Sequence, residues 1–415
     1  MPPFVADFHI HSRYSRATSK NLTLEELDRV AAEKGVAVLG TGDFTHPLWF
    51  AELERELEEV EPGLYKRKGS PYGTRFLLTC EVASIYSKGG AVRRVHTLLF
   101  APSLEAARTI NRQLGQVGNL HSDGRPILGL DIEELAKVAL AADERCMVIP
   151  AHAWTPWFSV FGSKSGFNSL EEAFGDMAPH IFAIETGLSS DPAMNWRVRA
   201  LDNIALISNS DCHSSPKIAR EANVFACEMS YDAIYDTLKT KDPKCFIETL
   251  EFFPEEGKYH YDGHRACNIR QKPVGPGAQE CPVCGRPLTV GVLSRVEELA
   301  TRPEGEKPPV AVPFRNIIPL EELIAESYGT GVGTKRVAQT YRALLDEFGT
   351  MLNVVLDVAV PDIQRVGGLA VAEAVRRTRE GAVHIEPGYD GEYGTIAVLS
   401  AEERAALNET QRPLF

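Results

Sequence analysis

Hydrophobic and polar positions alternate with two different periods along the first 245 residues, and these periods predict alternating strands and helices. Apolar runs rich in β-branched and aromatic residues predict strands at 5–10, 36–44, 75–86, 93–101, 146–154, 180–187 and 204–213. Amphipathic stretches predict helices at 21–35, 47–60, 103–115 and 131–142. In the first helix we expect Thr23 as the N-cap and Gly35 as the stop. Strands separated by helices are typical of an α/β protein with a parallel sheet or barrel.

The pattern changes after residue 245, where the alternation gives way to shorter and more varied segments. A Cys- and His-rich stretch precedes the proline-rich "TRPEGEKPPVAVP", two helical patterns around a glycine-rich turn, and "IEPGYDGEYGTIAV", which resembles a β-hairpin. The expected divisions are a first domain at 1–245, a small module at 246–300, a linker at 301–314, a helical domain at 315–405 and a tail at 406–415.

Composition narrows the class of protein. A chain of 415 residues has room for two or three domains. No apolar run is long enough to span a bilayer, and "MPPFVAD" lacks a signal-peptide pattern, so we expect a cytoplasmic protein. The net charge of −13 argues against a surface coated in basic residues but leaves room for local positive charge. Among the eight cysteines, Cys267, Cys281 and Cys284 cluster, which in a reducing compartment indicates a metal.

Residues that can ligate metals recur at the ends of the predicted strands. His9 and His11 lie one residue apart, so strand alternation places both on one face. The C-terminal ends of parallel strands meet on one face of an α/β fold, where residues far apart in the sequence can share a site. Each residue alone could be a cap or a core position, but the series favours metal binding. The candidate ligands are His9, His11, Asp43, His46, Glu81, His96, His152, Asp211 and His213.

The ligand types indicate the metal and its chemistry. Imidazole and carboxylate suit zinc, manganese or iron better than calcium, which takes only oxygen ligands. Clustered divalent ions, with magnesium as a further choice in an assay, suit phosphoester hydrolysis because they activate water and neutralise the phosphoryl group. We therefore expect two or three divalent metals, bridged by Glu81, with Glu81, Asp211 and His213 as catalytic residues. No Ser-His-Asp elbow or Walker lysine competes for this role.

The order HxH, GD, Glu, His, His and DxH resembles the PHP (polymerase and histidinol phosphatase) superfamily. The resemblance implies a distorted (β/α)7 barrel with three metals. It assigns one metal to His9, His11, Glu81 and Asp211, a second to Glu81, His96 and His152, and a third to His213. At the third site the chain departs from the pattern, because residues 16–18 are Arg-Ala-Thr where many members carry His or Asp. Asp43 or His46 is the expected substitute.

The Cys- and His-rich stretch carries a sharper signal. "CPVCG" is a knuckle in which two thiolates hold one metal while the glycine permits a tight turn. An HxxC pair precedes it, so we expect one structural zinc, with His260 as a rival fourth ligand. The expected ligands are His264, Cys267, Cys281 and Cys284. Between residues 258 and 295, six Lys or Arg against two Asp or Glu indicate a polyanionic partner, although a solvated loop would explain any single arginine.

The glycine-rich turn between the C-terminal helical patterns resembles the helix-hairpin-helix of DNA repair proteins. In that motif, backbone amides at a helix N-terminus bind a phosphate without regard to sequence. The expected contacts are Gly331, Gly333 and Lys335. A glycine-rich helix C-cap is the alternative.

The ligand series, the zinc module and the helical C-terminal region together resemble the endonuclease Q family, as do "GTGDFTHP", "FGSKSGFNSLEEAFGD" and "PGYDGEYG". Its members nick DNA immediately 5′ of uracil, hypoxanthine, xanthine and abasic sites, leaving a 3′-hydroxyl and a 5′-phosphate. The resemblance implies a cytoplasmic, nucleoid-associated DNA repair endonuclease acting on double- or single-stranded DNA. The residues alone indicate only a metal-dependent phosphoesterase of nucleic acid. A small-molecule phosphatase of the histidinol-phosphate type and a non-catalytic DNA-binding adaptor are the alternatives.

An enzyme that reads a deaminated base must flip it into a pocket, so stacking and hydrogen-bonding side chains are expected beside the metals. The segment after His152, "AWTPWFSVFGSKSGFNS", offers both, although aromatic residues at this spacing are more often part of a core. The candidates are Trp154, Trp157, Phe158, Ser163, Lys164, Ser165 and Asn168.

The last five residues, "QRPLF", follow a helical pattern and carry two large apolar groups. The string resembles the QxxLF motif by which bacterial repair and replication proteins dock on the sliding clamp, with Gln411, Leu414 and Phe415 as anchors. The alternative is that Phe415 packs back on its own C-terminal domain.

Overall fold

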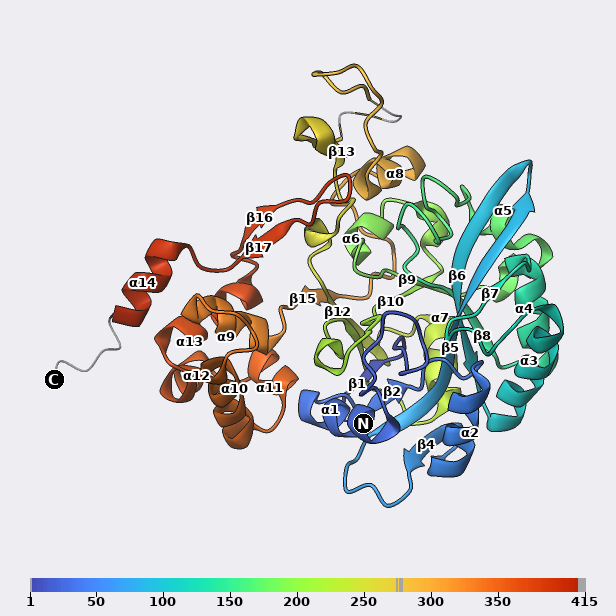
Figure 1. Cartoon of the computed structure of the whole chain (residues 1–415), viewed down its shortest axis with the longest axis horizontal. Coiled ribbons are helices and arrows are strands. Elements are labelled where there is room, and N and C mark those ends of the chain that lie inside the picture. Colours follow the sequence, from blue (N-terminus) through green and yellow to red (C-terminus); the bar gives the residue numbers. More distant parts are fainter. Residues whose placement is uncertain (1, 274, 276–278, 410–415) are drawn as a thin grey trace.

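The computed structural model describes residues 2–273, 275 and 279–409. Three regions are visible in Figure 1: a large α/β region that begins at the N-terminus, a small module around β13 and α8, and a group of helices from α9 onward. No helix in the described ranges combines the length and the apolar character needed to cross a membrane.

The large region is built on a mixed sheet. At its centre β1 (Phe4–Asp7), β2 (Val38–Gly40) and β5 (Arg75–Lys88) run parallel. Beyond β5, the strands β6 (Ala91–Ala101) and β8 (Met147–Pro150) follow, and each is antiparallel to the strand before it. Beyond β1 lie β11 (Ala222–Phe225), β12 (Phe246–Glu251) and β15 (Phe314–Asn316). The short strands β3 (Leu57–Glu61), β4 (Leu64–Arg67) and β7 (Ile127–Leu128) pair at the β5 side, while β9 (Ala183–Glu185) and β10 (Ala205–Ile207) form a separate parallel pair.

The separate pair joins the main sheet at both sides. Ala153 N, just after β8, donates to Glu185 O in β9 at 2.9 Å, and Phe8 N, just after β1, donates to Asn209 Oδ1 at 2.8 Å. One buried apolar cluster draws alternate residues from β1, β2, β5, β6, β8, β9 and β10, among them Ala6, Val38, Leu77, Leu98, Ile149, Ala183 and Ile207. The main sheet and the separate pair therefore share one apolar core. The strands β6 and β11 each run antiparallel to a central strand, which corrects the expectation of a parallel sheet.

Helices cover the outside of the strands. They are α1 (Leu24–Lys34), α2 (Pro47–Glu56), α3 (Leu104–Val117), α4 (Ile132–Ala142), α5 (Leu170–Phe174), α6 (Pro192–Asn195) and α7 (Tyr231–Thr240). The predicted caps of α1 are confirmed, because Thr23 accepts from Glu26 N and Gly35 adopts a left-handed conformation. The predicted helix at 47–60 is too long. It ends at Glu56 because Leu57–Glu61 pairs with β4, so pairing outweighs helix propensity there.

The small module contains β13 (Asp262–His264), β14 (Ile269–Gln271) and α8 (Val292–Leu299). The helical region contains α9 (Leu320–Tyr328), α10 (Lys335–Phe348), α11 (Met351–Leu356), α12 (Val360–Gly367) and α13 (Leu369–Glu380). After it come the antiparallel strands β16 (His384–Glu386) and β17 (Thr395–Ala397), which confirm the predicted hairpin, and α14 (Ala401–Glu409). The hairpin loop returns to the module, where Tyr261 N donates to Gly388 O at 3.0 Å.

A buried lysine joins the helical region to the large α/β region. Lys34, at the end of α1, is 1% exposed, and its Nζ lies 2.7 Å from Pro216 O and 3.3 Å from Glu321 Oε1 in α9. Beside it Lys217 pairs with Glu322 at 2.6 Å. These contacts hold the helical region against the turn that follows the Asp211–His213 segment.

Candidate metal centre and DNA-binding cleft

The structure brings six of the nine predicted ligands into two adjacent groups that share Glu81. In the first group the ligand atoms of His9, His11, Glu81 and Asp211 all lie within 4.8 Å of one another. His11 Nε2 lies 3.1 Å from Asp211 Oδ1 and 3.2 Å from Glu81 Oε2. The isolated bridge between Ile10 and Cys212 brings these two distant segments side by side.

The second group consists of Glu81, His96 and His152. Glu81 Oε1 lies 2.7 Å from His96 Nδ1 and 3.1 Å from His152 Nε2, while Oε2 faces the first group. Glu81 and His96 sit within β5 and β6 rather than at strand ends. The antiparallel register pairs Ala83 with His96, which puts Glu81 and His96 on one face as diagonal neighbours.

Two buried carboxylates orient the histidines of the first group. Glu185, at the end of β9, contacts His9 Nδ1 at 3.0 Å and accepts from His152 N at 2.7 Å. Asp43 contacts His11 Nδ1 at 3.0 Å. A carboxylate behind each ring fixes its tautomer and leaves Nε2 free to ligate. His9 Nε2 is buried and has no hydrogen-bond partner among the described residues, so this donor set fits a metal ion.

Charge in the centre also suits a cation. Burial would raise the pKa of Glu81, but His96, Arg125 and His9 hold it well below its ordinary value. Burial lowers the pKa of His96 to about 4, so at neutral pH its ring is the neutral form that ligates. Burial would likewise lower the pKa of His9, but the carboxylates of Glu185, Asp211 and Glu81 raise it well above its ordinary value. The carboxylates therefore attract positive charge into a buried space.

The residues expected at a third metal do not form a third group. Both Asp43 oxygens are engaged, since Oδ2 accepts from Ser12 N and Ser15 Oγ while Oδ1 meets His11. His46 stacks on Tyr14, with ring centroids 4.5 Å apart, and lies outside both groups. His213 is next to the first group, its ring 4.5 Å from that of His11. In the part of the chain that the structure describes, Asp43 and His46 join neither ligand group, although His46 Nδ1 is buried without a hydrogen-bond partner, so their role at a third metal stays a prediction.

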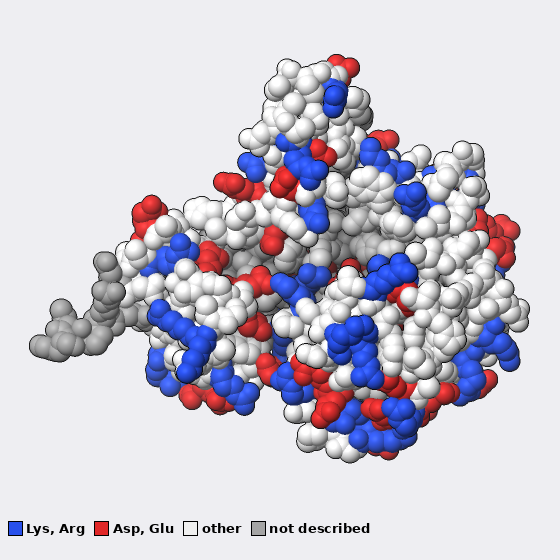
Figure 2. Space-filling view, in the orientation of Figure 1, with Lys and Arg blue, Asp and Glu red and all other residues white. Residues whose placement is uncertain are grey.

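A pocket of about 660 Å³ lies beside the two groups. Its aromatic wall includes Trp157, Tyr259 and Tyr393, and its basic side includes Lys217, Arg220 and Lys258. Arg220 donates to Asp211 O at 3.2 Å, and Thr155 Oγ1, which also lines the pocket, lies 3.3 Å from His152 Nδ1. The walls therefore touch the loops that carry ligands of both groups. Figure 2 shows a hollow in this face of the molecule, with blue Lys and Arg side chains at its rim.

The segment after His152 divides between this pocket and the interior. Trp157 is 37% exposed, and its ring centroid lies 5.5 Å from that of Tyr259. The ring centroids of Phe158 and His96 are 4.7 Å apart. Trp154 is instead buried, with its Nε1 donating to Asn195 Oδ1 at 2.7 Å, so it is a core residue and cannot stack on a base.

The polar candidates of the same segment also separate. Arg295 of α8 is buried and donates to Asn168 Oδ1 at 2.7 Å, which ties this segment to the small module. Ser165 is buried and donates to Arg94 O at 3.2 Å. Ser163 Oγ is buried without a partner among the described residues, and Lys164 is exposed. The Ser165 hydroxyl and the Asn168 Oδ1 are thus already used by hydrogen bonds within the protein.

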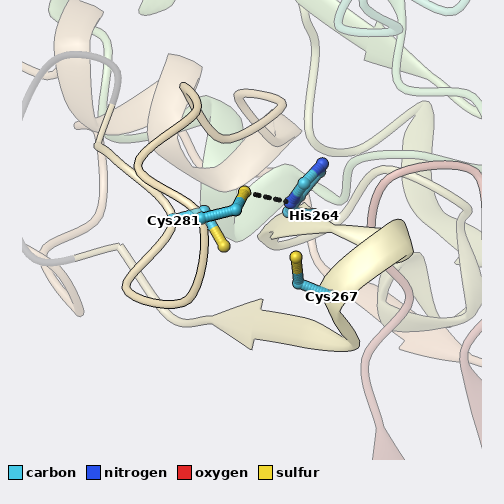
Figure 3. A group of neighbouring side chains, drawn as sticks. His264, Cys267 and Cys281 are labelled. Carbon is cyan, nitrogen blue, oxygen red and sulfur yellow. Dashed lines mark hydrogen bonds between the residues drawn. The ribbon is translucent and has the colours of Figure 1, made fainter.

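The small module contains the predicted cluster of His264, Cys267, Cys281 and Cys284, whose ligand atoms lie within 4.8 Å of one another. Figure 3 shows His264, Cys267 and Cys281 pointing toward a common centre. Burial would raise the pKa of Cys281, but hydrogen bonds from Val283 and Cys284 lower it to about 6, which favours the thiolate that binds metal. His260 is buried outside the cluster and is not the fourth ligand.

The predicted glycine-rich turn connects α9 to α10. Gly331, Gly333 and Lys335 are exposed, and a Cβ added to either glycine would meet nothing within 4 Å. Arg336 lies over the Tyr328 ring at 3.7 Å. The turn is thus open to solvent, with basic side chains at the start of α10. The clamp-motif residues Gln411, Leu414 and Phe415 lie outside the described residues.

Residues 319–382, which span α9 to α13, match the family model of the MJ0043 C-terminal domain. The chain is 30% identical over 413 residues to the uncharacterized protein YqxK of Bacillus subtilis, covering 95% of this chain and 100% of that protein. It is also 30% identical over 256 residues to the uncharacterized protein MJ0043 of Methanocaldococcus jannaschii, covering 59% of this chain and 31% of that protein.

Two solved structures match nearly the whole chain. The lesion-specific endonuclease PfuEndoQ of Pyrococcus furiosus has a TM-score of 0.84 and 31% identity, covering 98% of this chain and 99% of that chain. An endonuclease Q complex with a 27-mer duplex, which carries an abasic lesion at the active site, has a TM-score of 0.84 and 32% identity, covering 99% and 100%. A match of this extent, together with the Cys3His cluster and the paired ligand groups, means that the chain belongs to the endonuclease Q family.

Proposed function

We propose that this protein is a DNA repair endonuclease that hydrolyses the phosphodiester 5′ of uracil, hypoxanthine, xanthine and abasic sites. The observation that carries the proposal is the pair of ligand groups sharing Glu81, set beside an aromatic and basic pocket. Phosphodiester hydrolysis adds water to phosphorus and breaks the P–O3′ bond. The products are a 3′-hydroxyl, which takes up a proton, and a 5′-phosphate on the nucleotide that carries the lesion.

The metal centre provides the chemistry. His9, His11, Glu81 and Asp211 would hold one divalent ion, and Glu81, His96 and His152 a second. Zinc, manganese or iron suits these ligands, and when bound such ions supply positive charge to the phosphoryl group and activate water. Within the chain, Glu185 and Asp43 keep the rings of His9 and His11 aligned. His213 lies close enough to the first group to contact substrate.

The pocket beside the centre is our proposed site for the flipped lesion nucleotide. Trp157 and Tyr259 offer aromatic faces for stacking, and Lys258 and Arg220 offer positive charge to the flanking phosphates. Phe158, Ser163 and Lys164 remain candidates for contacts at its edge. Three parts of the chain would then enclose the DNA: a PHP-type distorted (β/α)7 barrel at residues 1–245, a zinc module at 246–300, and a helical domain at 315–405 reached through the linker at 301–314.

The helical domain would add affinity without sequence preference. Gly331 and Gly333 expose backbone amides, and Lys335 adds a positive charge at the start of α10. This arrangement suits a helix-hairpin-helix contact to phosphate. The tail at 406–415 is proposed to bind the sliding clamp, and we expect the protein to work in the cytoplasm at the nucleoid.

A nicking assay tests the function. Duplexes and single strands labelled at one end, with uracil, hypoxanthine, xanthine, an abasic site or a normal base at one position, are incubated with enzyme and divalent metal. The expected result is one cut immediately 5′ of each lesion and none in the normal strand. Hydrolysis of small phosphomonoesters without nicking would identify a phosphatase instead, and lesion binding without cleavage would identify an adaptor.

A further inference from the structure

Arg125 lies at the edge of the metal centre, although no sequence pattern indicates it. Its Nη1 donates to Glu81 Oε2 at 3.0 Å. The same oxygen lies 3.2 Å from His11 Nε2 and 3.5 Å from His9 Nε2. A permanently charged guanidinium therefore shares the bridging carboxylate with the first ligand group.

The loop that carries Arg125 is held in place on both sides. A Cβ at Gly124 would collide with the Asp43 carboxylate and the Ser15 hydroxyl, so only glycine permits this close approach. Gly124 N donates to Tyr14 O at 3.1 Å, and Ala83 N donates to Pro126 O at 3.0 Å. Arg125 therefore starts from a backbone position that is fixed before any substrate arrives.

The guanidinium retains hydrogen-bonding capacity. The Arg125 side chain is 27% exposed, and its contact with Glu81 is its only hydrogen bond to another described residue. Because Glu81 belongs to the first group, the charge stands close to where a phosphate bound at that group would lie.

We propose that Arg125 is a catalytic residue whose N–H groups not used by Glu81 bind a nonbridging oxygen of the scissile phosphate. The proposal rests on the proposed function. Guanidinium donors match phosphate geometry in pairs, and a fixed charge aimed at the phosphoryl group favours the transition state, where negative charge accumulates. Arg125 would thus supply positive charge to a phosphate bound beside Glu81.

The test compares Arg125→Gln, Arg125→Lys and the matched control Arg108→Gln. Arg108 is an exposed arginine of α3 that pairs with Glu54 and Glu105, so its replacement removes the same charge away from the centre. We expect Arg125→Gln to slow single-turnover nicking by about 10²- to 10³-fold, comparable to the loss of one transition-state donor. Arg125→Lys should fall between wild type and Arg125→Gln, and Arg108→Gln should match wild type.

A second readout does not depend on catalysis. Each phosphate contact contributes about 0.9 to the slope of log K against log salt for duplex DNA. This slope is negative, because binding weakens as the salt concentration rises. In metal-depleted protein, Arg125→Gln should make the slope for an abasic duplex shallower by about 0.9. Metal content of the loaded enzyme should equal that of wild type.

Several outcomes would overturn the proposal. Wild-type nicking by Arg125→Gln, or an unchanged salt slope, would show that the arginine is only a counter-ion of Glu81. Loss of bound metal from Arg125→Gln would make Arg125 a positioning residue for Glu81. If Arg125→Gln fails to fold by thermal melting, Arg125→Lys decides the question, and wild-type rates and slope there would refute phosphate binding through a paired guanidinium. Failure of the wild-type enzyme to nick any lesion would refute the proposed function instead, and the salt slope would still report on phosphate binding.

Discussion

Replacing Glu185 with glutamine should weaken both ligand groups at once. The fully buried carboxylate meets three N–H donors: His9 Nδ1 at 3.0 Å, His152 N at 2.7 Å and Asn209 Nδ2 at 2.9 Å. An amide has one accepting oxygen, so Glu185→Gln turns an NH2 toward at least one of these donors. If that donor is His9, its proton moves to Nε2 and removes the lone pair that would ligate.

The expected size follows from these contacts. Loss of a carboxylate behind a ligating histidine typically lowers metal affinity about 10- to 100-fold, which is about 1.4 to 2.8 kcal/mol. A buried donor left without an acceptor costs about 1 to 3 kcal/mol of stability. Glu185→Gln should therefore bind both metals more weakly and melt at a lower temperature.

The assay titrates metal-depleted protein with zinc in a chelator buffer and measures nicking at each free zinc concentration. Glu251→Gln is the matched control. Burial raises the pKa of Glu251 to about 8, so this carboxyl is mostly protonated at neutral pH, and its partners Thr186, Ser208 and Thr249 are hydroxyls that can donate or accept. Glutamine should replace it with little effect. Zinc affinities of Glu185→Gln within twofold of wild type, or an equal loss in Glu251→Gln, would refute the reasoning.

Asp211→Ala should abolish nicking while most DNA affinity remains, because basic side chains and not the ligands bind the phosphates; retained cleavage with metals titrated would remove Asp211 from the ligand set. Cys281→Ser should release about one zinc per chain and weaken DNA binding, since a closed four-ligand site loses its fold with its metal; full zinc content would contradict this. Trp157→Ala should reduce lesion affinity by about 1 to 3 kcal/mol in an anisotropy titration, as loss of one stacking face does, with metal content unchanged as the control. Deleting residues 411–415 should abolish clamp binding in a pull-down without changing the nicking of short oligonucleotides, and lost thermal stability would instead indicate a structural tail.

The parts of the site that the sequence predicts are those where a short motif carries the whole geometry. In the zinc module, each pair of ligands lies within a few residues, so spacing alone places His264 beside Cys267 and Cys281 beside Cys284. His9 and His11 likewise follow from strand alternation. Glu81 and His96 were predicted as ligands, but their position within an antiparallel pair depends on a register that one strand alone does not contain.

Other assignments depend on contacts that only the folded chain has. The sequence does not distinguish Trp154 from Trp157. In the structure, Trp154 contacts Asn195 in the interior, whereas Trp157 lines the pocket. The hydrogen bonds that Asp43 makes with Ser12, Ser15 and His11 likewise join residues from separate parts of the fold. Arg125 lies in a loop without periodicity, and its role becomes visible only when β5 brings Glu81 beside it.

The two ligand groups differ in how far apart their residues lie along the chain, and this difference sets when each can form. Glu81 and His96 belong to neighbouring strands of one hairpin. Contacts within a hairpin are local in the sequence, so they can form early in folding. His11 and Asp211 are 200 residues apart, and β1 pairs with the late strand β11 as well as with β2. Since synthesis proceeds from the N-terminus, a growing chain carries five of the six ligands once His152 is made, and Asp211 is added last. A ribosome-bound chain that ends before Asp211 therefore lacks a complete first group, so the nuclease activity that we propose would appear only when the large α/β region is finished.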